Sequence, residues 1–166
     1  MFKPDVYLSS VLQITPNLLT NIKAFAIIVD VDNTIRHYGR TELLSGVLNW
    51  VDSMKRCGIR LAIASNNFKK NIKPVANMLD IPYVSFSFKP LPIGLRKAAK
   101  ILGVDNENIA VVGDQFFTDV IGGKLQGFKT ILVEPLSKEK GFFWRFRRNL
   151  ENIVLHKNSI SKEDVF

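Results

Sequence analysis

The sequence predicts an α/β fold built on an open parallel sheet with helices on both faces. Apolar runs of strand length alternate with amphipathic stretches of helical length from residue 25 to about residue 135. The first run, residues 25–29, is apolar throughout and leads directly into a polar turn, which is typical of a strand covered on both faces. Strands that alternate with helices over short connections favour a parallel sheet.

Each expected strand is a short apolar run that stops at polar or turn-forming residues. The second runs into Ser65-Asn66-Asn67, and the fourth runs into Gly113-Asp114. The expected bounds are residues 25–30, 59–64, 83–86, 109–112 and 130–133.

The stretches that follow the first four strands are expected to be helices, the first of them with an apolar stripe along one face. In the first, Val47, Val51 and Met54 recur at helical spacing, and Gly58 follows as a C-terminal glycine. The expected bounds are residues 43–56, 72–79, 92–102 and 118–125.

The composition is that of an ordinary globular chain. It has 166 residues, of which 46% are hydrophobic and 23% charged, and this length suits a single domain. We expect a core over residues 25–135, an N-terminal docking segment over 1–24 and a basic, aromatic C-terminal segment over 136–166. No run is long and apolar enough to cross a bilayer, and no secretory signal is evident. A cytoplasmic protein is therefore expected, with peripheral attachment to the inner face of the membrane as an option.

The cysteine content and the charge restrict the chemistry further. Cys57 is the single cysteine, which excludes an internal disulfide and fits a reducing compartment. A cysteine-type phosphatase needs an arginine six positions after its nucleophile, and that position holds Ile63. The net charge of +8 attracts phosphorylated substrates, anionic lipid or nucleic acid without choosing among them.

Polar side chains follow four successive strands at the point where each strand ends. Because the carboxyl ends of parallel strands meet at one edge of a sheet, we expect these side chains to form one site. Asp30 and Asp32 are spaced i, i+2 and repel each other unless a cation or a proton lies between them. The full set is Asp30, Asp32, Thr34, Ser65, Asn66, Lys89, Asp114 and Asp119.

Three of these residues suit the catalytic steps of phosphoryl transfer. Asp30 is the candidate nucleophile, because a carboxylate can form an aspartyl-phosphate. Asp32 is the candidate general acid and base, which protonates the leaving alcohol and then deprotonates the attacking water. Lys89 supplies a compact positive charge that stabilises the transferring group.

The metal site is expected to be all-oxygen and to hold Mg²⁺. Asp114 completes it together with the Asp30 carboxylate and the Asp32 carbonyl. Asp119 is expected to ligate the ion directly or to hold a metal-bound water. A plainer role for Asp119 is to place a charge in the first turn of the following helix.

The substrate-binding candidates are Thr34, Ser65 and Asn66. Ser65 offers a hydroxyl and Asn66 a backbone N–H to the phosphoryl oxygens. Plainer roles compete here as well, since Ser65 alone could cap a helix. Thr34 could serve its loop rather than the substrate, and the side chain of Asn66 could shape its loop.

The four motifs resemble, in order, those of the haloacid dehalogenase (HAD) superfamily of phosphatases. They are Asp30-Val31-Asp32-Asn33-Thr34, Ser65-Asn66-Asn67, Lys89-Pro90 and Gly113-Asp114-Gln115-Phe116-Phe117-Thr118-Asp119. Within the superfamily they are similar to subclass IIIA proteins of the YqeG type, which are related to phosphatidylglycerophosphate phosphatases of mitochondria and plastids. The resemblance implies a HAD-like Rossmannoid core and a Mg²⁺-dependent phosphatase. It also implies phosphatidylglycerophosphate, or a similar phospholipid phosphomonoester, as the substrate.

HAD proteins often carry a cap domain, and the motif spacing here predicts none. One loop, one helix and one strand fill the chain between Thr34 and Ser65. A helix and a short strand fill the chain between Ser65 and Lys89. The site is therefore expected to be open and to suit a bulky or surface-bound substrate.

The flanking segments leave several alternatives open. Residues 141–148 interleave aromatic residues with arginines, a composition that can lie on an anionic membrane, pack on the sheet or bind nucleic acid. Residues 2–14 carry a weak apolar stripe, which is expected to pack on the rest of the protein. If this segment is helical, it is a docking helix. A phosphatase of nucleic-acid ends or phosphoproteins, and a weakly catalytic binding module, are the alternative functions.

Overall fold

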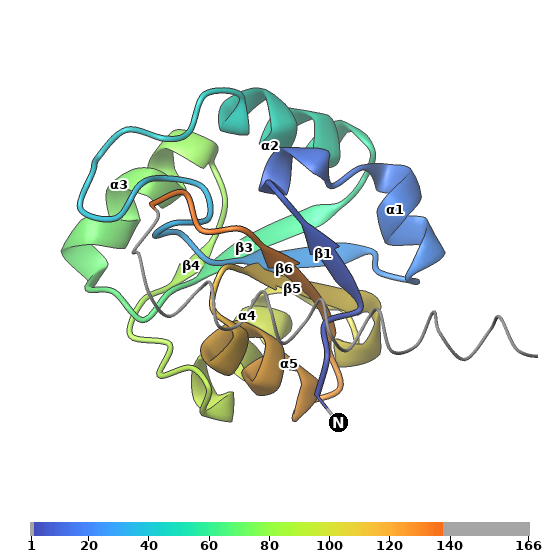
Figure 1. Cartoon of the computed structure of the whole chain (residues 1–166). Coiled ribbons are helices and arrows are strands. Elements are labelled where there is room, and N and C mark those ends of the chain that lie inside the picture. The colour runs from blue at the N-terminus through green and yellow to red at the C-terminus, as the bar shows by residue number, and fades with distance from the viewer. Residues whose placement is uncertain (1, 138–166) are drawn as a thin grey trace, which may run out of the picture. The chain divides into compact units, whose positions relative to one another are not determined.

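A parallel sheet forms the centre of the computed structural model, which describes residues 2–137 (Figure 1). Its strands lie in the order β1-β6-β5-β2-β3-β4, and every neighbouring pair is parallel. Their bounds are β1 Val6–Leu8, β2 Ala26–Val29, β3 Arg60–Ala64, β4 Tyr83–Val84, β5 Ile109–Gly113 and β6 Lys129–Val133. The expected open parallel α/β sheet is thus confirmed.

Helices cover both faces of this sheet (Figure 1). The α-helices are α1 Pro16–Asn21, α2 Val47–Arg56, α3 Lys69–Leu79, α4 Pro92–Leu102 and α5 Gly122–Lys124. The other helical turns are η1 Val11–Gln13, η2 Asn106–Asn108 and η3 Phe116–Ile121, the last of which is π-helical. Within residues 2–137, none of the helices has both the length and the apolar character needed to span a bilayer.

The central strand β2 is buried on both sides, as its continuous apolar sequence predicts. Ile27 and Val29 point into the core cluster that also contains side chains of α2 and α3. Ala26 and Ile28 point into a second cluster, which contains side chains of α4. This alternation places every residue of β2 in a core and makes the strand a rigid support for whatever follows it.

The strand order reverses at β2, and this reversal positions the site. From β2 the chain proceeds to β3 and β4 on one side of the sheet, and later to β5 and β6 on the other. The crevice outside the carboxyl end of such a strand is where parallel α/β sheets bind ligands. Asp30 is the first residue after β2, and its backbone N–H still pairs with Val112 of β5.

The segment before β2 differs from its prediction. Residues 6–8 are not helical but form the edge strand β1, whose Val6 and Leu8 pair with Ile131 and Val133 of β6. The carboxylate of Asp5 fixes this edge, because it accepts bonds from the Thr130 backbone N–H at 2.7 Å and from Lys124 Nζ at 2.6 Å. The short strand was missed because three residues give too little alternation to recognise.

Several boundaries also differ from the prediction. The helix expected over residues 72–79 begins at Lys69, and the helix expected over 118–125 is the π-helical η3 followed by the short α5. The first long helix begins at Val47 rather than Leu43, because Leu43 pairs with Arg36 in an isolated bridge. The strand at residue 83 stops at Val84, since Phe86 turns into a left-handed conformation. Phe25 precedes its strand and is 55% exposed.

No cap domain interrupts the described chain. Between β2 and β3 lie one loop and α2, and between β3 and β4 lies α3. The basic, aromatic segment of residues 141–148 lies outside the described residues, so the alternatives for it stay predictions.

Gly94, in the first turn of α4, lies against the loop that leads to Lys89. A Cβ at this position would overlap the backbone of Ser87, whose side chain is fully buried. We expect Gly94→Ala to lower the free energy of unfolding by about 1–3 kcal/mol through overpacking, although alanine is the better helix former. Urea unfolding measures the change, with the exposed Lys97→Ala in the same helix as the control. An unchanged or higher stability of Gly94→Ala would contradict this close contact.

Candidate active site

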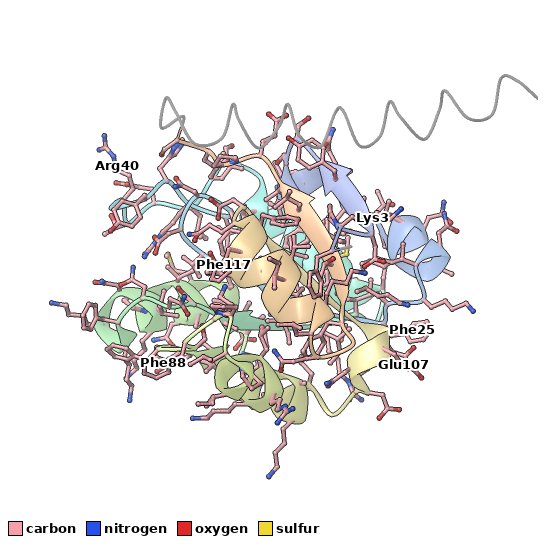
Figure 2. The ribbon with its side chains drawn as sticks, turned by 60° about the horizontal axis from the view of Figure 1, so that its bottom comes forward. Lys3, Phe25, Arg40, Phe88, Glu107 and Phe117 are labelled. Atoms are coloured by element: carbon pink, nitrogen blue, oxygen red, sulfur yellow. The ribbon has the colours of Figure 1, made fainter. Side chains whose placement is uncertain are left out.

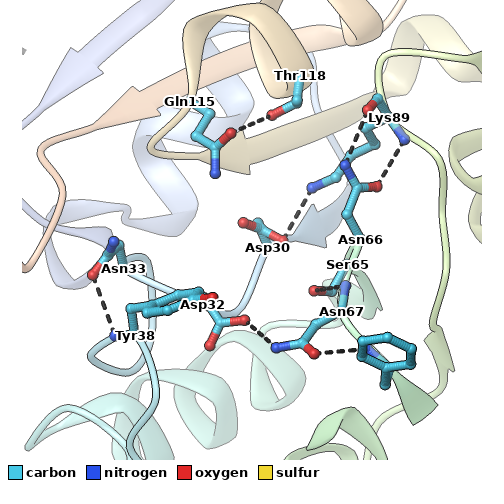
Figure 3. Close-up of a pocket in the computed structure, with 11 residues that line it drawn as sticks. Asp30, Asp32, Asn33, Tyr38, Ser65, Asn66, Asn67, Lys89, Gln115 and Thr118 are labelled. Carbon is cyan, nitrogen blue, oxygen red and sulfur yellow. Dashed lines mark hydrogen bonds and ion pairs between the residues drawn. The ribbon is translucent and has the colours of Figure 1, made fainter. Parts of the chain in front are cut away.

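A buried lysine joins two carboxylates at the carboxyl edge of the sheet. Lys89 Nζ lies 3.1 Å from Asp30 Oδ1 and 2.6 Å from Asp119 Oδ1. All three residues are buried, and Figure 3 shows Lys89 and Asp30 pointing toward each other. The three come from the end of β2, the loop before α4 and the helical turn after β5, so the sheet brings together residues far apart in the sequence.

A third carboxylate, that of Asp114, completes an acidic cluster. Asp30, Asp114 and Asp119 each offer a carboxylate oxygen within 4.8 Å of the other two. Thr34 Oγ1 donates to Asp114 Oδ1 at 3.3 Å and orients this carboxylate. The last residue of β5 is Gly113, where a Cβ would overlap the Asp119 carboxylate, so a glycine is needed for the cluster to close.

Burial and mutual repulsion make it unfavourable for all three carboxylates of this cluster to be ionised. Desolvation raises the pKa of Asp30 to about 6, and Lys89 only partly offsets this effect. Desolvation, together with repulsion from Asp30 and Asp119, raises the pKa of Asp114 to about 8. Burial works against the charge of Lys89, but Asp119 and Asp30 outweigh it and hold its pKa above the ordinary value. One lysine therefore does not balance three carboxylates.

The donor set fits a divalent cation. Oxygen ligands at close range are what hard cations prefer, and two of these carboxylates hold protons more tightly than ordinary ones do. Asp119 already uses both oxygens, since Oδ1 meets Lys89 and Oδ2 accepts the backbone N–H of Gln115 at 3.1 Å. Asp30 and Asp114 could therefore supply the carboxylate ligands of the ion, while Asp119 holds Lys89 in place.

Asp32 points in another direction and belongs to a separate network. Its Oδ1 accepts a hydrogen bond from Arg36 Nε at 2.9 Å. Its Oδ2 accepts one from Asn67 Nδ2 at 2.7 Å (Figure 3). The Asp32 carboxylate is thus outside the acidic cluster, and a metal role for its backbone carbonyl stays a prediction. Two donors thus fix the side chain at the pocket wall, and its role in proton transfer stays a prediction.

The loops after β3 and before α4 are tied together by one amide side chain. Asn66 Oδ1 accepts the Lys89 backbone N–H and the Ser87 hydroxyl, both at 2.8 Å, and its Nδ2 donates to the Lys89 carbonyl at 3.0 Å. Its side chain therefore positions Lys89, while its backbone N–H remains a candidate phosphate donor. The buried Ser65 hydroxyl accepts the backbone N–H of Asn67 at 3.2 Å.

A pocket of about 290 Å³ opens onto these groups. Five of the eight predicted residues line it, namely Asp30, Asp32, Ser65, Asn66 and Lys89. The other three, Thr34, Asp114 and Asp119, do not line it. A substrate contact by Thr34 therefore stays a prediction, while the structure shows its hydroxyl on Asp114.

Several residues of the site were not singled out from the sequence. Arg36 is buried beside Asp32, and its Nη1 donates to the Asn71 carbonyl at 3.0 Å. Asn67 and Tyr38 line the pocket. The spacing of four residues between Asp32 and Arg36 is compatible with an ion pair. Only the folded loop shows that the arginine is buried and so needs a partner.

Comparison with known proteins gives consistent similarities. The sequence model of the haloacid dehalogenase-like hydrolases matches residues 16–127. The chain is 34% identical over 154 residues to "Probable phosphatase YqeG" of Bacillus subtilis (strain 168), covering 93% of this chain and 90% of that protein.

Two further similarities are more limited. Over 59 residues the chain is 41% identical to "Phosphatidylglycerophosphate phosphatase 1, chloroplastic/mitochondrial" of Arabidopsis thaliana, which is 35% of this chain and 17% of that protein. Among solved structures, an uncharacterized protein from Listeria monocytogenes serotype 4b superposes with a TM-score of 0.55 at 19% identity, over 70% of this chain and 84% of that one. The structural match supports the fold alone.

The raised pKa values of Asp30 and Asp114 predict how pH controls cation binding. Their bound protons stabilise the cation-free protein at low pH, and this stability is lost as pH rises through about 6 and then about 8. Protons and the cation compete for the same carboxylates. We expect MgCl₂, compared with EDTA, to raise the melting temperature clearly at about pH 8.5 and little at about pH 5. Asp114→Asn is expected to weaken this stabilisation, and an equal shift at both pH values would contradict the assignment.

Proposed function

This chain belongs to the haloacid dehalogenase-like hydrolases, and on that premise we propose that it is a Mg²⁺-dependent phosphatase acting through an aspartyl-phosphate on Asp30. The observation that carries the proposal is the position of Asp30. It lines the pocket, contacts the buried Lys89 and shares an acidic cluster with Asp114. A nucleophile, a fixed positive charge and a cation site thus meet at one point. The bacterial relative named as a probable phosphatase supports the same reaction.

In the first proposed step, Asp30 attacks the phosphorus of a phosphomonoester. The bond from phosphorus to the alcohol oxygen breaks as the bond to the Asp30 carboxylate forms. Asp32 gives a proton to the departing oxygen, so the product leaves as a neutral alcohol. Lys89 and the Ser65 hydroxyl stabilise the oxygens of the transferring group.

In the second step, water hydrolyses the phospho-Asp30. Asp32, now ionised, takes a proton from the water, which attacks phosphorus and releases inorganic phosphate. The carboxylate of Asp30 is regenerated, and Asp32 is again protonated. Asp30 and Asp114 would hold the Mg²⁺ ion, which supplies positive charge that reduces the repulsion between the carboxylates and the phosphate. Asp119 keeps Lys89 in place throughout, through the contact at 2.6 Å.

For the substrate we propose phosphatidylglycerophosphate or a similar phospholipid phosphomonoester. The partial match to a protein named as a phosphatidylglycerophosphate phosphatase supports this class. The described chain has no cap domain, so a phosphate group held at a surface can reach the pocket without a domain having to open. The protein would then work peripherally on the cytoplasmic face of a membrane.

Replacing the nucleophile tests the covalent mechanism. Asp30→Asn should lower kcat by roughly a thousandfold or more, because an amide cannot attack phosphorus. The fold should survive, since Lys89 keeps its contact with Asp119. The matched control is Asp80→Asn, which changes a fully exposed carboxylate at the far end of α3. Acid-quenched wild-type protein should carry a phosphoryl group on Asp30 by mass spectrometry, and near-normal turnover of Asp30→Asn would discard the mechanism.

Phosphate release from phosphatidylglycerophosphate in mixed micelles tests the substrate class. We expect release with Mg²⁺, none with EDTA and none with Asp30→Asn. A soluble phosphomonoester, a 5′-phosphorylated oligonucleotide and a phosphopeptide serve as comparison substrates, each expected to react with a lower kcat/KM. A higher kcat/KM on the oligonucleotide or the phosphopeptide would keep the reaction and reject the lipid.

A further inference from the structure

The loop that delivers Lys89 to the site also carries exposed aromatic rings. Phe86 and Phe88 are 44% and 56% exposed, and Phe68 is 56% exposed. The ring centroids of Phe68 and Phe86 lie 4.8 Å apart, and those of Phe86 and Phe88 lie 6.3 Å apart. We call these three residues the phenyl cluster. Phe68 also lines the pocket, so the cluster begins at the mouth of the site.

The exposure of these rings follows from how the loop is fixed. Ser87 and Lys89 must point inward, because both bond to Asn66 and Lys89 reaches Asp30. Phe86 precedes Ser87, and Phe88 lies between Ser87 and Lys89, so both phenyl rings point outward. The backbones of Phe86 and Phe88 are left-handed, with φ of 49° and 54°. Asparagine or glycine suits this conformation better than phenylalanine. The backbone conformation thus gives no reason for phenyl rings at these two positions.

Aliphatic side chains extend the apolar surface beyond the phenyl cluster. Leu91 is 57% exposed, and its backbone N–H bonds to the Phe88 carbonyl, which places it one turn away. Ile93, at the start of α4, is 64% exposed. Exposed apolar side chains gathered in this way, rather than scattered singly, mark an interaction surface.

The charge on the two helices that flank this surface is of one sign. The helices on either side of it, α3 and α4, contain no acidic residue. The one acid between residues 65 and 104 is Asp80, which follows the C-terminal end of α3 and lies near Lys55. The exposed cations of the two helices are Lys69, Lys70, Lys73, Arg96, Lys97 and Lys100.

We infer that the phenyl cluster, Leu91, Ile93 and the flanking lysines and Arg96 form a docking surface for an anionic lipid membrane. Aromatic and aliphatic side chains can enter the membrane interface while the cations meet anionic head groups. The aliphatic residues favour lipid over nucleic acid, because bases stack on aromatic faces and gain nothing comparable from Leu91 or Ile93. This inference deepens the proposed function and rests on it, since a membrane orientation serves a substrate that resides there.

Binding to vesicles tests the surface with full-length protein. Wild type should co-sediment with phosphatidylglycerol–phosphatidylcholine vesicles and much less with phosphatidylcholine alone. The double variant Phe86→Asn/Phe88→Asn keeps side chains that tolerate the left-handed backbone and should bind at least about tenfold more weakly. Phe25→Ser is the matched control, because Phe25 is 55% exposed and lies across the molecule from Phe88 (Figure 2). No binding by wild type, or equal binding by the double variant, would overturn the inference.

A spin label locates the contact directly, whatever other parts of the chain bind. In a Cys57→Ser background, a nitroxide at position 88 should become accessible to oxygen and shielded from a polar relaxant on anionic vesicles. The same label at position 25 should stay in water. A label at 88 that remains in water on vesicle-bound protein would refute the docking surface.

The outcomes separate this inference from the proposed function. Asp30→Asn should bind vesicles as wild type does, while losing turnover. Phe86→Asn/Phe88→Asn should hydrolyse a soluble phosphomonoester at the wild-type rate, while losing activity on vesicle-bound lipid. Loss of RNA binding rather than vesicle binding in the double variant would replace the membrane by nucleic acid as the partner.

Discussion

The buried ammonium of Lys89 between Asp30 and Asp119 is the interaction on which the rest of the site depends. Three carboxylates this close, largely removed from water, cannot all stay ionised without compensating positive charge. Other features of the structure serve to hold this one lysine. Asn66 bonds both backbone polar groups of Lys89, and Gly113 leaves the space that Asp119 needs. The remaining excess of negative charge is what suits the cluster to a divalent cation.

The general position of this site was predictable because it follows from strand order. Apolar runs that end in polar residues are visible in the sequence, and parallel strands bring those ends to one edge. Asp30 and Lys89 lie far apart in the chain and nevertheless meet at 3.1 Å. The family resemblance rested on the same motifs, and the match over residues 16–127 confirms it. The fold class and the region of the site were thus predictable from repeated local patterns in the sequence.

The features that were not predicted depend on contacts that leave no local pattern in the sequence. The edge strand β1 is defined by its pairing with β6 at the other end of the chain. The helix at Pro16 did have local signals, since Thr15 caps it through the Leu18 N–H and proline suits its first position, but it is too short for an apolar stripe. The partners of Asp32 were not evident either, because side-chain hydrogen bonds depend on rotamers and burial. Thr34 illustrates this point, as its spacing fits a substrate contact but its hydroxyl meets Asp114.

The loop from residue 86 to 89 links the chemistry of the site to the surface around it. Along residues 86–89 the side chains are alternately exposed and buried, and Phe86 and Phe88 have left-handed backbones, so a lysine fixed inside places the residue before it outside. Lys89 and Phe88 are therefore not independent features, because a shift of one residue would move the charge out and a phenyl ring in. A phosphate that reaches Lys89 enters a pocket whose lining includes Phe68, and the Phe68 ring also contacts Phe86. The charge of Lys89 and the apolar surface thus share one support, and under the function proposed above this arrangement would hold a membrane-bound phosphate group at Asp30 without a cap domain.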